Sequence, residues 1–247
     1  MGKQELAILY SGNIDSLALY VLAAAGRHAD IPPPRKIHLL CMQNGALRFL
    51  NFPFERFKAA EKILKAQAPS TEPMSDGSFV ELDTTRIFQG LWLNRYEELM
   101  PRYKGKNLLC TACRLAMHVR GVVYCVERLV PIFIVGPSGT QSCCPKLTEA
   151  FIAKAMAFSS DFGITTRFPL DSDSDDEMVI KHLLEDYGLP SDEGGEPKCL
   201  FSQTITTATE KEITNYLDDM IPQLKTYVES RLEGNIRDAS MCFASFR

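Results

Sequence analysis

The chain has 247 residues, which is enough for one sizeable α/β domain with an appendage. Its hydrophobic fraction of 45% and charged fraction of 23% are ordinary for a globular protein, and its net charge of −4 excludes a surface that is basic overall and attracts nucleic acid by charge alone. We expect no stretch apolar enough to span a bilayer, and the first residues lack the layout of a secretion signal. These features predict a cytoplasmic protein whose eight cysteines stay reduced, as ligands, nucleophiles or core residues.

Short apolar runs alternate with segments of helical periodicity along the chain. The first run, 6–10, ends at a Ser-Gly turn and is typical of a buried parallel strand. Short connections between alternating strands and helices predict an α/β fold, a parallel twisted sheet with helices on both faces. The expected strands are 6–10, 36–42, 79–82, 131–135 and 165–168. The expected helices are 16–27, 54–68, 84–100, 113–129, 147–162, 174–187 with a capping box at Ser174 and Glu177, and a last one that starts at a capping box of Thr209 and Glu212 and is interrupted by Pro222.

The loop at 11–16 joins the first predicted strand to the first predicted helix. Ligands of such sheets bind outside the carboxyl ends of the strands, and a helix N-terminus offers unpaired N–H groups and a positive dipole end to an anion. Two serines add hydroxyl donors, and the glycine lets the backbone approach a phosphate closely. The alternative is a plain turn with a helix N-cap, because Ser, Asn and Asp all favour such positions. The loop reads Ser11, Gly12, Asn13, Ile14, Asp15 and Ser16.

This loop resembles the PP-loop of the ATP pyrophosphatase superfamily, Ser-Gly-Gly-x-Asp-Ser. Asn13 stands where that family has a second glycine, and Asn tolerates positive φ well enough to keep the shape of the loop. The resemblance implies a fold of the adenine nucleotide alpha hydrolase type over 1–190, followed by a cysteine-bearing loop and helical C-terminal extension over 191–247. It also implies that ATP is cleaved between its α and β phosphates, with the loop and Asp15 holding pyrophosphate and Mg²⁺.

Weaker resemblances continue along the chain. Segment 36–43 is similar to the family's second strand, whose end contacts adenine, so Met42 is a candidate adenine contact; simple core packing is its alternative. Gly136 follows the strand at 131–135 and is similar to the family's nucleotide-side loop. These residues join the six of the first loop as candidate nucleotide-binding residues.

Cys110 and Cys113 lie at a predicted loop-to-helix junction, where the helix N-terminus favours a thiolate. Their layout with the distant Cys199 resembles the sulfur-transfer branch of the PP-loop family, which includes tRNA thiolation enzymes. In one implied mechanism Cys199 carries a persulfide and Cys110 then forms a disulfide with it. In another, Cys110, Cys113 and Cys199 hold a [4Fe-4S] cluster. From the residues alone, zinc or no site at all stays open, with Cys125, Cys143, Cys144 or His118 as candidates for a fourth zinc ligand.

The sequence therefore predicts ATP-dependent adenylation of a substrate oxygen followed by sulfur transfer. The substrate is either tRNA or a small molecule or carrier, a sulfur donor protein is a candidate partner, and a homodimer is a candidate assembly. One alternative is a ligase of the 7-cyano-7-deazaguanine synthase type with zinc, and another is a nucleotide-binding regulatory protein without turnover. Arg114 and His118, four residues apart on one helix face, are expected either to meet an anionic substrate or to be solvated.

Overall fold

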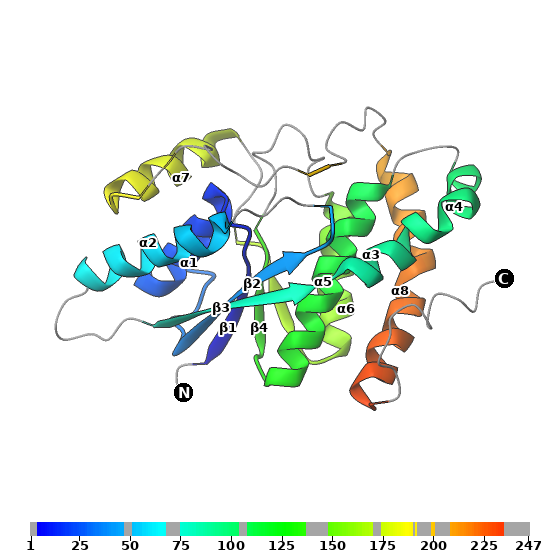
Figure 1. Cartoon of the computed structure of the whole chain (residues 1–247), viewed down its shortest axis with the longest axis horizontal. Helices are drawn as coiled ribbons and strands as arrows, with labels where there is room; N and C mark the ends of the chain where they lie inside the picture. The colour runs from blue at the N-terminus through cyan, green and yellow to red at the C-terminus, as the bar shows by residue number, and fades with distance from the viewer. Residues whose placement is uncertain are drawn as a thin grey trace.

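The computed structural model describes residues 4–46, 51–67, 75–103, 108–136, 148–169, 174–189, 191, 199–200 and 208–234. Five strands and the helices between them alternate along the chain (Figure 1). The strands are β1 (Glu5–Leu9), β2 (Lys36–Gln43), β3 (Asp76–Asp83), β4 (Ile132–Ile134) and β5 (Thr165–Arg167). The helices are α1 (Ile14–Ala25), α2 (Phe52–Gln67), α3 (Thr85–Leu91), the 3₁₀ turn η1 (Leu93–Arg95), α4 (Tyr96–Arg102), α5 (Leu109–Arg128), α6 (Glu149–Asp161), α7 (Ser174–Asp186) and α8 (Glu210–Leu232).

The strands form one parallel sheet in the order β3-β2-β1-β4-β5. β1 is central, and Leu6 lies between Ile37 of β2 and Ile132 of β4. This position explains its apolar sequence, because a central parallel strand is buried on both faces. The predicted α/β fold is confirmed. The carboxyl ends of β1, β2 and β4 meet at one edge of the sheet, which therefore is the edge where the loop at 11–16 lies.

Helices cover both faces of the sheet (Figure 1). One apolar cluster joins β1 and β2 to α1, α2 and α7, and includes Leu17, Phe57 and Leu184. The second cluster lies on the other face and joins the sheet to α3, α5, α6 and α8. Because successive strand residues point to opposite faces, alternate residues of β2 enter different clusters, with Leu39 in the first and Leu40 in the second.

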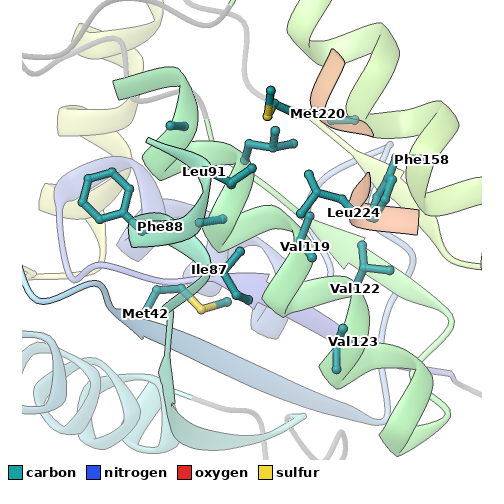
Figure 2. Packing of buried hydrophobic residues seen from close by; sticks show 14 of the residues in the cluster. Met42, Ile87, Phe88, Leu91, Val119, Val122, Val123, Phe158, Met220 and Leu224 are labelled. Atoms are coloured by element: carbon teal, nitrogen blue, oxygen red, sulfur yellow. The ribbon is translucent and has the colours of Figure 1, made fainter. Parts of the chain in front are cut away.

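The second cluster is built around α5 (Figure 2). Val119 and Val122 of this helix pack with Ile87 of α3 and Leu224 of α8 in the same cluster. In length and composition α5 is apolar enough to cross a membrane, contrary to the sequence expectation, but 67% of its 18-residue apolar stretch is buried inside the protein. α5 is therefore the core helix of the second cluster.

Two predicted helices differ from the structure in more than the position of their ends. The segment expected as one helix over 84–100 is divided into α3, η1 and α4, because Trp92 leaves the helical conformation at φ −142° and its ring is buried against Tyr216 of α8. Pro222 was expected to interrupt the last helix, but α8 runs through it from Glu210 to Leu232. The capping box of Thr209 and Glu212 is confirmed.

α8 is tied to the preceding layer by polar as well as apolar contacts. The buried hydroxyl of Tyr216 donates to the carbonyl of Leu91 at 2.9 Å. Arg95 forms an ion pair with Glu98 at 2.6 Å and donates to Gln223 at 3.2 Å. The helical extension thus shares the core of the α/β layer, and the division of the chain near residue 190 stays a prediction.

Candidate functional site

The loop at 11–16 bends at Gly12, where φ is +78°. Asn13 has φ −68° and is the N-cap of α1, so the left-handed residue is Gly12 and not Asn13. The expected positive φ at Asn13 is therefore wrong. Asn13 keeps the loop in shape in a different way, because its side chain accepts the backbone N–H of Ser16 at 3.0 Å.

The loop is held by further hydrogen bonds among its own residues. The N–H of Ser11 donates to the hydroxyl of Ser16 at 3.3 Å, and that hydroxyl donates to the carbonyl of Asn13 at 3.2 Å. The N–H of Asn13 donates to the hydroxyl of Ser11 at 3.4 Å. Several donors that a phosphate would use are thus paired inside the loop, as the turn and N-cap interpretation expects.

The start of α2 covers the loop. A Cβ atom on Gly12 would lie 2.7 Å from the Cα of Pro53, so only glycine fits beneath this turn. Arg56 of α2 donates to the carbonyl of Gly12 at 3.4 Å, with its guanidinium 4.7 Å from the ring centroid of Phe52. Residues 12–16 are all buried as a result.

Gly136 lies beside the same loop. It follows β4, and a Cβ atom on it would lie 3.9 Å from the Cβ of Asp15 and 3.0 Å from Leu19 of α1. Asp15 is 1% exposed, in the first turn of α1. The structure therefore brings together two residues that are far apart in the sequence and that were both predicted to bind nucleotide.

Met42 does not join them through its side chain. It is 3% exposed and packs in the cluster with Ile87 and Phe88 on the α5 side of the sheet (Figure 2). Cys41 and Gln43, its neighbours on β2, face the other side and line a cavity of about 170 Å³ with Pro53 and Phe79. The Met42 side chain therefore packs in the core, which is the alternative to an adenine contact.

The turn after β2 lies at the same edge of the sheet as the loop at 11–16, and it contacts two of the cysteine segments. Cys110 and Cys113 lie in the first turns of α5, and the side chain of Asn44 donates to the Sγ of Cys113 at 2.9 Å. The N–H of Leu200, next to Cys199, donates to the carbonyl of Ala46 at 2.9 Å. Cys113 and the segment of Cys199 therefore meet the same short turn, 44–46, although they are distant in sequence.

Asn44 was missed in the sequence. It is 2% exposed and its Oδ1 also accepts the N–H of Ala46 at 2.9 Å, so it holds the turn and reaches Cys113 at once. Its place directly after a parallel strand is the signal that could have identified it, because ligands bind outside the carboxyl ends of such strands.

Among the residues that the structure describes, the three candidate cysteines are not grouped as a metal-ligand set. Within the described residues, no three His, Cys, Asp or Glu side chains are arranged to hold a metal ion. Of the candidate fourth zinc ligands, Cys125 is fully buried in the core and burial raises its thiol pKa to about 12. Cys143 and Cys144 lie outside the described residues.

His118 is a core residue. It is 2% exposed, its Nε2 lies 3.0 Å from the carbonyl of Ala155 and 2.8 Å from the hydroxyl of Ser159, and burial lowers its pKa to about 4. Both sequence expectations for it, an anion contact and a solvated face, are wrong. A neutral buried imidazole faces neither a substrate nor water.

No protein-family model matches the sequence, and no curated protein matches it. Among solved structures, the chain is similar to the U34-tRNA thiolase NcsA from Methanococcus maripaludis with its [4Fe-4S] cluster, at 13% sequence identity and a TM-score of 0.43. The match covers 100% of this chain and 75% of that chain. A likeness this distant carries no argument about function, and the fold assignment rests on the order and direction of the strands.

Proposed function

We propose that the chain is an ATP-dependent adenylating enzyme of the PP-loop type that transfers sulfur to its substrate. The observation that carries the proposal is the convergence at the turn 44–46, where Cys113 and the segment of Cys199 meet at the carboxyl edge of the sheet. The loop at 11–16 follows β1 at the same edge. A nucleotide loop and a thiol group on one edge are the two parts that an adenylation and sulfur-transfer reaction needs.

The first step would take place at the loop. The substrate oxygen attacks the α-phosphorus of ATP, the bond to the β-phosphate breaks, and pyrophosphate leaves with its electron pair. Ser11, Gly12 and the first amides of α1 would hold the pyrophosphate, because a helix N-terminus favours anions. Asp15 would hold Mg²⁺, which neutralises the developing charge when bound. Ile14 and Gly136 would shape the floor of the site.

The second step would use the cysteines. A sulfur donor protein places a persulfide on Cys199, and its terminal sulfur attacks the adenylated carbon, from which AMP leaves with the substrate oxygen. The thiolate of Cys110 then attacks the inner sulfur of Cys199, so that a disulfide forms and the transferred sulfur stays on the substrate. A dithiol reductant returns both cysteines to thiols.

The proposed steps use the thiols without a metal or cluster. The described side chains of Cys110, Cys113 and Cys199 are not arranged as a ligand set. To hold zinc or a [4Fe-4S] cluster, these cysteines would have to come closer to one another. Zinc would also need a fourth ligand, whereas a cluster could leave one iron open. Metal analysis and an anaerobic absorption spectrum of the purified protein show whether it holds a metal or cluster. The thiol mechanism also requires that metal-depleted protein still transfers sulfur.

The substrate is proposed as a class, tRNA or a small molecule or carrier that presents a carbonyl or hydroxyl oxygen. The net charge of −4 gives no general attraction for RNA. A cytoplasmic location and a homodimer also stay predictions.

Release of AMP and pyrophosphate, measured alongside sulfur incorporation, tests the proposal. We expect C110S and C199S both to release pyrophosphate, because adenylation does not need the thiols, and both to lose sulfur incorporation. Only C110S should also release AMP, because AMP leaves when the Cys199 persulfide attacks. C41S is the matched control, since that thiol is 1% exposed on the other face of β2 and its pKa is raised to about 12 by burial. Equal sulfur incorporation by C199S and the native protein would refute the assigned role.

One observation favours the regulatory alternative as a second candidate. Asn13 and Ser16 pair several of the donors that a phosphate would use, and Pro53 covers Gly12. A protein that binds ATP with this loop but does not turn it over would show ATP binding by calorimetry with neither pyrophosphate nor AMP released. That result would replace the enzymatic proposal.

A further inference from the structure

Two residues outside the loop at 11–16, Arg56 and Tyr10, lie beside it on the side of α2. Arg56 is 8% exposed, and its guanidinium reaches the carbonyl of Gly12 at 3.4 Å. Tyr10 is the last residue before the loop and is 1% exposed. The charge of Arg56 acts on the phenol of Tyr10, so the two groups lie within electrostatic reach of each other.

The hydroxyl of Tyr10 has no hydrogen-bond partner within the described residues. Its ring is held by an edge contact with Phe79, with the centroids 6.2 Å apart. Leaving a buried hydroxyl without a partner is unfavourable, and a buried tyrosine usually finds one. Phe would fill the same space without that penalty, so packing alone does not account for a tyrosine here.

Arg56 brings a full positive charge to the end of α1 that is already positive. The dipole of α1 places a partial positive charge at its first turn, and the guanidinium approaches the same loop. Asp15 in that turn supplies one negative charge. The carbonyl of Gly12 is a neutral acceptor at a long distance, whereas a phosphate oxygen accepts shorter and stronger charge-assisted bonds from arginine.

We propose that Arg56 and Tyr10 are phosphate-binding residues that extend the 11–16 loop on the side of α2. The guanidinium of Arg56 exchanges the Gly12 carbonyl for a phosphate oxygen of a bound polyphosphate, and the hydroxyl of Tyr10 donates to the same group. The inference deepens the proposed function and rests on it, because the ligand is the phosphate chain of a nucleotide. No covalent step is involved.

Titration calorimetry of the full chain with ATP, with tripolyphosphate and with adenosine tests the inference. We expect R56Q to weaken ATP and tripolyphosphate binding by about 10-fold to 100-fold, since a hydrogen bond to a charged group is lost. R56K keeps the positive charge but not the planar guanidinium with its paired N–H donors, so we expect a smaller loss of affinity than in R56Q. Binding of adenosine should not change in either variant.

Y10F is the sharper variant, because only the oxygen is removed. We expect tripolyphosphate to bind about 3-fold to 10-fold more weakly, while thermal stability stays equal or rises. A purely structural role for the hydroxyl predicts the reverse, lower stability with unchanged affinity. This variant also keeps the test open if R56Q does not fold.

K58Q is the matched control on the same helix. Lys58 is 55% exposed in its side chain and pairs with Glu61 at 3.0 Å, so its loss should leave affinity unchanged. Native-like affinity of R56Q and Y10F for tripolyphosphate would overturn the inference while leaving the proposed function intact. If the native protein binds neither ATP nor tripolyphosphate, the proposed function falls as well.

Discussion

The buried imidazole of His118 makes the stability of the protein depend on pH. Its Nε2 faces the carbonyl of Ala155, which can only accept, so Nε2 carries the proton. Nδ1 is then the unprotonated nitrogen, and it is buried without a hydrogen-bond partner in the described part of the chain. A second proton would place a charge beside Phe133 and Phe158, whose rings contact the imidazole. Burial therefore lowers the pKa of His118 to about 4.

The sign of the effect follows from the two states. The unfolded chain takes up the proton near pH 6.5, whereas the folded protein does not until about pH 4, so acid favours unfolding between these values. Each unit of pH in that interval lowers the free energy of unfolding by about 1.4 kcal/mol. The total is about 3 kcal/mol, which is a large part of the stability of an ordinary domain.

Urea unfolding of the native protein and of H118Q at several values between pH 4.5 and 7.5 measures this term. Carboxylates also titrate in this range, so the quantity of interest is the difference between the two proteins. Gln keeps a donor for the carbonyl of Ala155 but cannot be protonated. We expect H118Q to be less stable at pH 7.5 and to lose less stability on acidification. Parallel pH profiles for the two proteins would refute a neutral buried His118.

Three further predictions concern other positions. L129G should raise the free energy of unfolding by up to about 1 kcal/mol by urea titration, because Leu129 has φ +57° and is 89% exposed, and L129A, which keeps a Cβ, should gain little. G121A should lower the free energy of unfolding by about 2 kcal/mol, since the new Cβ would lie 2.7 Å from Cε1 of Phe133. Adding F133L to G121A should recover part of that loss, because the smaller side chain makes room for the Cβ. N13G should cost only a few tenths of a kcal/mol in stability but strengthen tripolyphosphate binding by calorimetry, because the N–H of Ser16 loses its internal acceptor; weaker binding would contradict this reasoning.

Much of the fold could be predicted because it depends on local signals. The apolar run of β1 and its Ser-Gly end indicate a central parallel strand, and the pair Thr209 and Glu212 marks the start of α8. The division at Trp92 could not be predicted in this way. Trp92 leaves the helix where its ring packs on Tyr216 of α8, and that contact is absent from any local window of sequence.

The candidate site shows the same limit. Spacing correctly places His118 one turn after Arg114 on α5, but it does not say which face of the helix meets Ser159 of α6. Asn44 and Arg56 reach the site through contacts with Cys113 and Gly12, which the chain brings near only after the sheet has formed. Patterns in the sequence identify the loop motif, whereas the residues that surround it depend on the tertiary structure.

The internal bonds of the loop bear on how strongly a nucleotide can bind. An N-cap such as Asn13 contributes about 1 kcal/mol, whereas a hydrogen bond to a charged phosphate is worth about 1.5–3 kcal/mol. A phosphate that displaces the Asn13 side chain from the N–H of Ser16 therefore gains more than the loop loses. Pro53 is a different obstacle, because its Cα lies against Gly12 and backbone does not rotate aside as a side chain does. Residue 13 should thus tune the affinity for polyphosphate, while the position of the first turn of α2 decides from which side the phosphate can reach Gly12.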